Sequence, residues 1–172
     1  QKPTLPENID PAWSETGIDR LVVATMTAKG LKPVDLATAE VLVRRLYLDL
    51  IGLPPSPIEL EQWVERLEAR NQRQTALESL VDSLLESPQF GERWGRHWLD
   101  VARYAESNGN SRNATFPHAW RYRDYVIDAF NADTPFDQFI TQQIAGDLLP
   151  HKTTEQRNAN LIATGFLALA SK

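Results

Sequence analysis

A helix-capping signal in the first third of the chain constrains the fold more than any other feature. Ser56 is followed by Pro57 and, three residues after the serine, by Glu59, which is the capping-box pattern of a helix N-terminus. Apolar side chains then recur at i, i+3, i+4 and i+7, namely Leu60, Trp63, Val64 and Leu67. This spacing puts them on one face, so the segment is predicted to be an amphipathic helix packed on a core.

The same helical period recurs along the chain, with glycine, proline or a capping residue between the runs. We expect helices over Ile18–Gly30, Asp35–Ile51, Ser56–Leu67, Leu77–Leu85, Ser87–Glu106, His118–Phe130, Thr134–Leu148 and Thr153–Leu169. In the seventh, Gly146 is expected to allow close helix approach and Asp147 to pair with an arginine. No stretch alternates in the two-residue period of a strand, so we predict an all-α fold, a globular array of about eight helices with short loops and no substantial sheet.

The domain organisation follows from the two ends of the chain. Residues 1–15 are rich in proline and polar side chains and are expected to be an extended lead-in. A single helical domain is expected over residues 16–172, a length that suits one hydrophobic core. The last expected helix reaches Lys172 after an apolar run without a capping residue. We therefore expect the chain to be an excerpt of a larger multidomain protein.

Composition argues against several classes of function. The net charge is −5 and acidic residues interleave with the arginines, so nucleic acid is not an expected partner. Because there is no cysteine, disulfides, thiolate nucleophiles, cysteine-ligated zinc and covalently attached haem are excluded within this chain. No apolar run approaches the roughly 20 residues of a membrane span. No His-x-x-x-His or His-Glu-x-x-His pattern is present, and we expect no metal and no cofactor in this chain.

The residues best able to carry chemistry lie in the expected helix Ser87–Glu106. Arg93, His97, Asp100 and Tyr104 recur at the spacing of one helical face, beside an aromatic line. Asp100, one turn from His97, could orient the imidazole and raise its basicity, as general-base catalysis requires. The alternative is a structural ladder of Arg, His and Asp that only satisfies buried polar groups. The sequence leaves both alternatives open.

A polar loop and a short basic segment supply further candidates. Asn108 lies in the loop Glu106–Asn110, where it could bind a polyhydroxylated ligand or simply form an Asn-Gly turn. Arg121 can pair with Asp124 along a helix, or its neighbours Tyr122 and Arg123 can present a planar donor to a carboxylate or sulfate. The candidate catalytic residues are His97 and Asp100, and the candidate substrate-binding residues are Arg93, Arg103, Tyr104, Asn108 and Arg121.

Six ordered motifs give the chain a resemblance to a known family. They are Ile18–Arg20, Arg44–Pro55, Ser87–Tyr104, Ala119–Val126, Ala129–Asp137 and Ala145–Pro150. They resemble the planctomycete cytochrome-associated domain, called domain of unknown function 1549, from about Ile18 to Ala168. The resemblance implies a large exported protein, periplasmic or extracellular, in which a c-type haem domain often precedes this one. It also implies neighbouring domains of the same polypeptide as partners, and it brings no established catalytic residues.

Three functional hypotheses follow. The first is a binding or organising module, tied to polysaccharide use and with glycan as its partner. It is favoured because no complete catalytic motif stands out. The second is a carbohydrate-active enzyme that uses His97 and Asp100, with an oxidative reaction as one alternative. The third is a contact domain for haem or an electron-transfer partner. Whether the domain is an enzyme is left open by the sequence.

Overall fold

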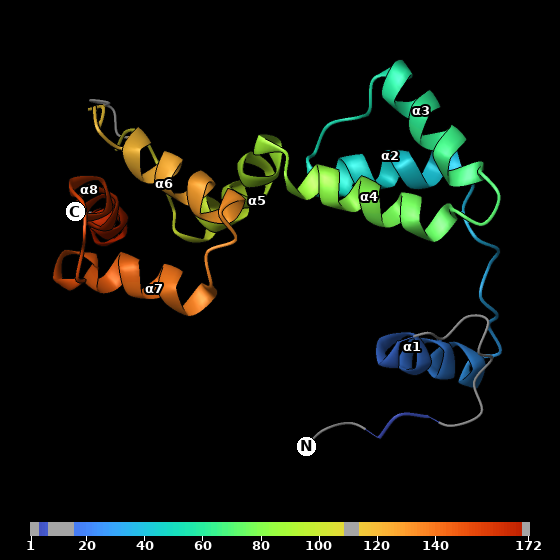
Figure 1. Cartoon of the computed structure of the whole chain (residues 1–172). Coiled ribbons are helices and arrows are strands. Elements are labelled where there is room, and N and C mark those ends of the chain that lie inside the picture. Colours follow the sequence, from blue (N-terminus) through green and yellow to red (C-terminus); the bar gives the residue numbers. More distant parts are fainter. Residues whose placement is uncertain (1–3, 7–15, 109–113, 170–172) are drawn as a thin grey trace. The chain divides into compact units, whose positions relative to one another are not determined.

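The computed structural model describes residues 4–6, 16–108 and 114–169 (Figure 1). In these residues the chain forms eight α-helices, two short 3-10 helices and no strand, which confirms the all-α prediction. The lead-in predicted over residues 1–15 lies outside the described residues, apart from 4–6. The chain divides into two compact units, Gln1–Thr38 and Ala39–Lys172, and each is described by itself.

The first unit contains α1 (Gly17–Ala28), which is capped at both ends. Thr16 Oγ1 accepts a hydrogen bond from the backbone N–H of Asp19, and the Asp19 carboxylate accepts one from the backbone N–H of Thr16 at 2.9 Å. At the other end Gly30 has φ of 70°, and the N–H of Leu31 donates to the Met26 carbonyl at 2.9 Å. The predicted helix end at Gly30 is confirmed.

The second unit begins with three helices, α2 (Ala39–Leu50), α3 (Pro57–Glu68) and α4 (Arg73–Leu85). They pack on one another around a common core of buried residues, namely Ala39, Val43, Tyr47, Leu67, Ala76, Leu80 and Leu84. The capping box predicted for α3 is confirmed. The backbone N–H of Ser56 donates to the Glu59 carboxylate at 2.8 Å, and the N–H of Glu59 donates to Ser56 Oγ at 3.3 Å.

The start of α2 differs from the prediction. The helix begins at Ala39, so the expected start at Asp35 is wrong. Asp35 and Thr38 are both residue types that cap helices, and the helix begins directly after the second of them. The sequence pattern could not choose between two capping residues three positions apart.

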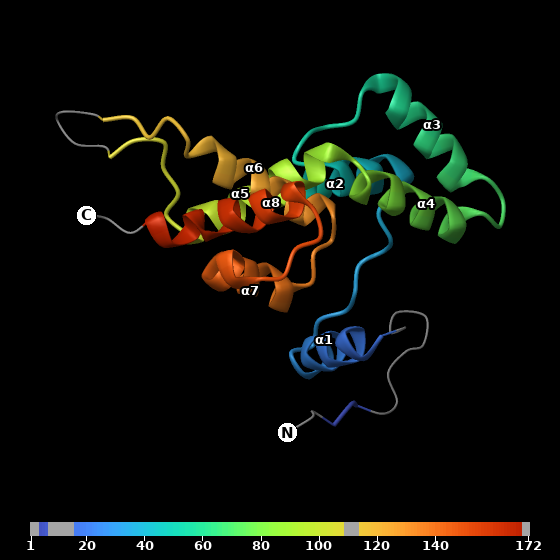
Figure 2. The same ribbon diagram turned by 60° about the vertical axis from the view of Figure 1, so that its left-hand side comes forward.

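The remaining helices form a second group, consisting of α5 (Pro88–Val101), α6 (Trp120–Asn131), α7 (Phe136–Ala145), η1 (Gly146–Leu148), α8 (Thr154–Ala163) and η2 (Thr164–Ala168). Figures 1 and 2 both show α5 beside α6. Gly91 allows this approach, because a Cβ atom there would lie 2.5 Å from the Ile127 carbonyl oxygen. Asn131 adds a bond across the contact, since its Oδ1 accepts from the Gly91 N–H at 2.8 Å. Close packing of α5 on α6 therefore depends on the absence of a side chain at Gly91.

The core of this second group contains one buried amide. Gln143 is 1% exposed and lies among the apolar residues of α6 and α7. Its Oε1 accepts from Trp98 Nε1 at 3.1 Å and from the Tyr122 hydroxyl, and its Nε2 donates to the Phe139 carbonyl at 3.1 Å. Because every polar atom of the amide is paired, the group can be buried without a large desolvation cost.

Two helix boundaries in this group correct the prediction. α5 ends at Val101, not at Glu106, because Arg103 adopts a left-handed conformation with φ of 57°. The backbone N–H of Tyr104 then bonds to the Leu99 carbonyl at 2.9 Å and closes the helix. Glycine is the usual residue in that conformation, so an arginine there gave no stop signal.

The expected start of α7 at Thr134 is also wrong. The helix starts at Phe136 after Pro135, with no side-chain hydrogen bond at its cap. The backbone N–H of Thr134 instead bonds to the Ala129 carbonyl at 3.0 Å, so this residue closes α6.

Candidate functional site

The residues predicted as a catalytic face lie on the solvent side of α5. Arg93, His97 and Asp100 are all exposed, so they do not form a ladder that satisfies buried polar groups. In the part of the chain that the structure describes, no hydrogen bond or ion pair joins His97 to Asp100. The His97 ring instead lies 5.4 Å from the ring of Trp94. The catalytic roles of His97 and Asp100 stay predictions.

Tyr104 lies beyond the end of α5 and belongs to a separate polar cluster. Its hydroxyl donates to Glu106 Oε1 at 3.1 Å, and the same oxygen accepts from Arg123 at 2.8 Å. Arg123 also pairs with Asp124 at 2.9 Å, so Asp124 has a partner other than the predicted Arg121. Burial, followed by the bond to Glu106 and its negative charge, raises the pKa of Tyr104 to about 12. These contacts attach the segment after α5 to α6.

The other predicted binding residues lie outside this polar cluster. The guanidinium of Arg121 lies 5.6 Å from the centre of the Trp120 ring, and Arg103 is exposed at the end of α5. Asn108 closes the base of its loop, because its Oδ1 accepts from the Ala114 N–H at 3.2 Å. The rest of the predicted Asn-Gly turn, including Gly109 and Asn110, lies outside the described residues. The predicted site residues therefore lie in several separate surroundings.

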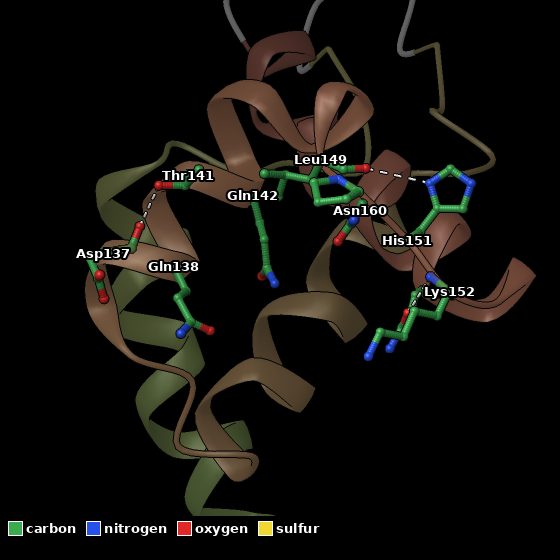
Figure 3. Close-up of a pocket in the computed structure, with 10 residues that line it drawn as sticks. Asp137, Gln138, Thr141, Gln142, Leu149, His151, Lys152 and Asn160 are labelled. Carbon is green, nitrogen blue, oxygen red and sulfur yellow. Dashed lines mark hydrogen bonds between the residues drawn. The ribbon is translucent and has the colours of Figure 1, made fainter.

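A pocket of about 560 Å³ lies between α7, α8 and the segment that joins them (Figure 3). Most of its lining side chains are polar, and four of them are uncharged amides. The lining residues are Asp137, Gln138, Thr141 and Gln142 of α7, Leu149, Pro150, His151 and Lys152 of the connecting segment, and Gln156 and Asn160 of α8. A cavity of this volume falls within the range of about 300–1,000 Å³ that is typical of small-molecule sites.

Two local features hold the α8 wall of the pocket. Gly146 lies against the backbone of Asn160, where a Cβ atom would clash with the Asn160 carbonyl oxygen. This confirms that the glycine permits close approach, and it brings α8 onto η1. Thr153 caps α8 as predicted, since its Oγ1 accepts from the N–H of Gln156 at 3.2 Å. Asp147, expected to pair with an arginine, is exposed and has no ion pair among the described residues.

The hydrogen bonds around the pocket determine which polar atoms face a ligand. The Thr141 hydroxyl donates to the Asp137 carbonyl at 2.7 Å, so its oxygen remains able to accept. The Tyr125 hydroxyl donates to Gln142 Oε1 at 2.8 Å, which leaves the amide nitrogen of Gln142 as a donor. The His151 ring makes a weak contact, 3.5 Å from Nδ1 to the Leu149 carbonyl. The pocket therefore offers both donors and acceptors.

The sequence patterns did not indicate this pocket. Its amides come from α7 and α8. Glutamine and asparagine are also common on the solvent-exposed face of any amphipathic helix, so their presence does not indicate a binding site. His151 stood alone in the sequence, without a second ligand or a base at a recognisable spacing. The one available signal was local, because Thr153 and Gln156 are recognisable as the start of a helix.

The described residues also bear on metal and membrane binding. They contain no group of three or more histidine, aspartate or glutamate side chains placed to hold a metal ion. Within the same residues, every helix is too short or too polar to cross a lipid bilayer.

A comparison with known protein families gives a match over most of the chain. A family model described as PSCyt2, protein of unknown function (DUF1549), matches residues 17–172. No curated protein and no solved structure matches the chain.

Proposed function

The chain belongs to the PSCyt2 family of proteins of unknown function (DUF1549), and we propose that it is a saccharide-binding module whose site is the pocket between α7 and α8. The observation that carries the proposal is the convergence of four side-chain amides, Gln138, Gln142, Gln156 and Asn160, on one pocket. An amide both donates and accepts, as a sugar hydroxyl does, so several amides can bind several hydroxyls in fixed directions.

The remaining lining residues support the same ligand class. Leu149 and Pro150 add apolar surface beside the amides, and the C–H faces of a sugar ring need such a surface. Asp137 adds a carboxylate that can accept from a pair of neighbouring hydroxyls. The mixture of uncharged polar groups and small apolar areas fits a polyhydroxylated ligand better than a lipid or a nucleotide.

The pocket supports binding rather than hydrolysis. Glycoside hydrolysis generally uses two carboxyl groups on either side of the scissile bond. Asp137 is the one carboxylate among the residues that line the pocket. Figure 3 places it on the opposite side from His151, so these two groups do not form an acid–base pair. A non-catalytic module is therefore the function that we propose.

We further propose that the module acts inside a longer exported protein, with a c-type haem domain and other domains as its neighbours. This setting rests on the family motifs in Arg44–Pro55 and Ser87–Tyr104. A haem stain of the natural protein, isolated from the periplasmic or secreted fraction, tests it directly. A haem-free natural protein confined to the cytoplasm would overturn it.

Calorimetric titration of the chain with a panel of neutral and acidic oligosaccharides tests the function. The double variant Gln138→Ala/Asn160→Ala removes two amides of the pocket, and neither side chain has a hydrogen bond within the described residues. Gln62→Ala is the matched control, because Gln62 is an exposed amide on α3. We expect binding by the unaltered chain and the control and weak or no binding by the double variant. Binding that is unchanged in the double variant, or absent across the whole panel, would overturn the proposal.

A further inference from the structure

One amide of the pocket has an orientation that its neighbours determine. The backbone N–H of Lys152 donates to Gln156 Oε1 at 2.8 Å. A backbone N–H can only donate, so the atom that it meets must be the carbonyl oxygen of the side chain. The Nε2 group of Gln156 is then the end left for a ligand, and nothing in the described part of the chain accepts from it. Gln156 therefore contributes two N–H donors.

The lining of the pocket also includes a positively charged side chain. Lys152 lines the same pocket, and the ion pairs found among the described residues both belong to Arg123. The Lys152 ammonium group therefore has no carboxylate partner among the described residues. The amide nitrogen of Gln142 is a further donor, because the Tyr125 hydroxyl occupies the Gln142 carbonyl oxygen. The pocket therefore combines amide donors from both α7 and α8 with an unpaired cation.

Two acceptors of the pocket lie on the side away from Lys152. Figure 3 shows Asp137 and Thr141 on one side, and His151 and Lys152 on the other. Thr141 uses its hydroxyl proton on the Asp137 carbonyl, so it can only accept from a ligand. A ligand that fits this polarity has hydroxyl groups at one end and a negatively charged acceptor at the other.

We propose that the pocket binds an acidic saccharide, with a sugar carboxylate held between Gln156 Nε2 and the Lys152 ammonium group. This inference rests on the proposed saccharide-binding function and adds the ligand's charge. A carboxylate accepts several hydrogen bonds through two oxygens, and bonds between charged partners are stronger than neutral ones. A neutral sugar would leave the Lys152 charge without a partner, so it gains less from the same pocket.

Paired ligands that differ only in charge test the inference. Oligogalacturonate is titrated against its methyl ester, and oligoglucuronate against its methyl ester, so that each pair shares one sugar backbone. We expect the acid of at least one pair to bind about tenfold more tightly than the ester, which corresponds to about 1.4 kcal/mol. The difference in affinity between the acid and the ester should shrink as salt is added, because salt ions screen the exposed charge of the Lys152 ammonium group.

The Gln156→Glu variant separates recognition from folding. Its carboxylate still accepts from the Lys152 N–H, but it replaces the two amide donors by a negative charge. We expect the preference for the acid over the ester to disappear. Lys152→Gln removes the cation alone and should reduce the preference, and Gln62→Ala should leave it unchanged.

Equal binding of acid and ester by the unaltered chain, or a preference that survives in Gln156→Glu, overturns the inference while the saccharide-binding function stands. If no acidic and no neutral saccharide binds, the function itself is wrong.

Discussion

Gln156 Oε1 accepts a hydrogen bond of 2.8 Å from the backbone N–H of Lys152, and this bond links the start of α8 to the polarity of the pocket. At the same helix end, Thr153 Oγ1 accepts from the N–H of Gln156. Gln156 therefore has two functions in the structure. Its carbonyl oxygen helps to begin a helix, and its amide nitrogen is left for a ligand.

The first prediction concerns the folding part of this arrangement. Gln156→Glu should unfold at the same temperature as the unaltered chain or at a higher one, because a carboxylate accepts the same bond and interacts favourably with the helix N-terminus, by about 0.3–1 kcal/mol. Gln156→Leu cannot accept the bond and should lose about 0.5–1.5 kcal/mol. Thermal unfolding followed by circular dichroism measures both. A Glu variant less stable than the Leu variant would contradict the assigned bond.

The second prediction compares two glycines of α5 that face α6. A methyl group on Gly91 would meet the Ile127 carbonyl oxygen at 2.5 Å, whereas one on Gly95 would meet side-chain atoms at an ordinary 3.4 Å. We expect Gly91→Ala to destabilise the domain by about 1–3 kcal/mol or more. Gly95→Ala should be close to neutral, because a gain in helix propensity of about 1 kcal/mol offsets any crowding. Chemical denaturation measures both, and equal effects would contradict the close approach of α5 to α6 at Gly91.

The third prediction concerns the buried amide Gln143. Gln143→Leu deprives the Tyr122 hydroxyl of its acceptor and should cost about 1–3 kcal/mol. Adding Tyr122→Phe to that variant should cost much less than Tyr122→Phe alone, because the group left unpaired is then absent. A double-mutant cycle by denaturant unfolding measures the coupling. Additive losses would show that the two side chains do not act together.

The fourth prediction concerns pH. The pKa of Tyr104 is raised to about 12, mainly by burial, and burial also raises the pKa values of Tyr47, Tyr122 and Tyr125. These are all four tyrosines of the chain. The folded state holds their protons more tightly than the unfolded state does. Their contribution to stability is therefore complete below the ordinary pKa of about 10 and is lost as the pH rises above it.

Parallel titrations check this fourth prediction. Phenolate absorbance and helical circular dichroism are followed on one sample from neutral to strongly alkaline pH. We expect phenolate to form mainly together with the loss of helix. A tyrosine that titrates reversibly near its ordinary pKa while the helices stay intact would contradict it.

Local signals predicted most of the fold. Ser56 and Thr153 cap helices with their own side chains, so a pattern of a few residues was sufficient to predict both starts. Arg103 ends α5 in a conformation that arginine seldom adopts, so its effect could not be predicted from residue type. Helix ends that depend on backbone conformation alone carry little sequence information.

The functional surfaces were harder to predict because they depend on packing. The helical period of α5 correctly predicted that Arg93, His97 and Asp100 share one face, but it did not predict which face of the helix packs against the core. Gly91 and Gly95 decide that by packing on α6, which leaves the polar side chains in solvent. The pocket needs α7 and α8 side by side, and no pattern within either helix predicts that meeting.

The most direct test of the binding site is a nuclear magnetic resonance titration that follows the side-chain amide groups. A uniformly nitrogen-labelled chain is titrated with the tightest-binding saccharide of the panel. We predict saturable shifts in the NH₂ signals of the four pocket amides, Gln138, Gln142, Gln156 and Asn160, with Gln62 on α3 unmoved. Silent pocket amides, with shifts around His97, Asp100 or Tyr104 instead, would contradict the proposed site.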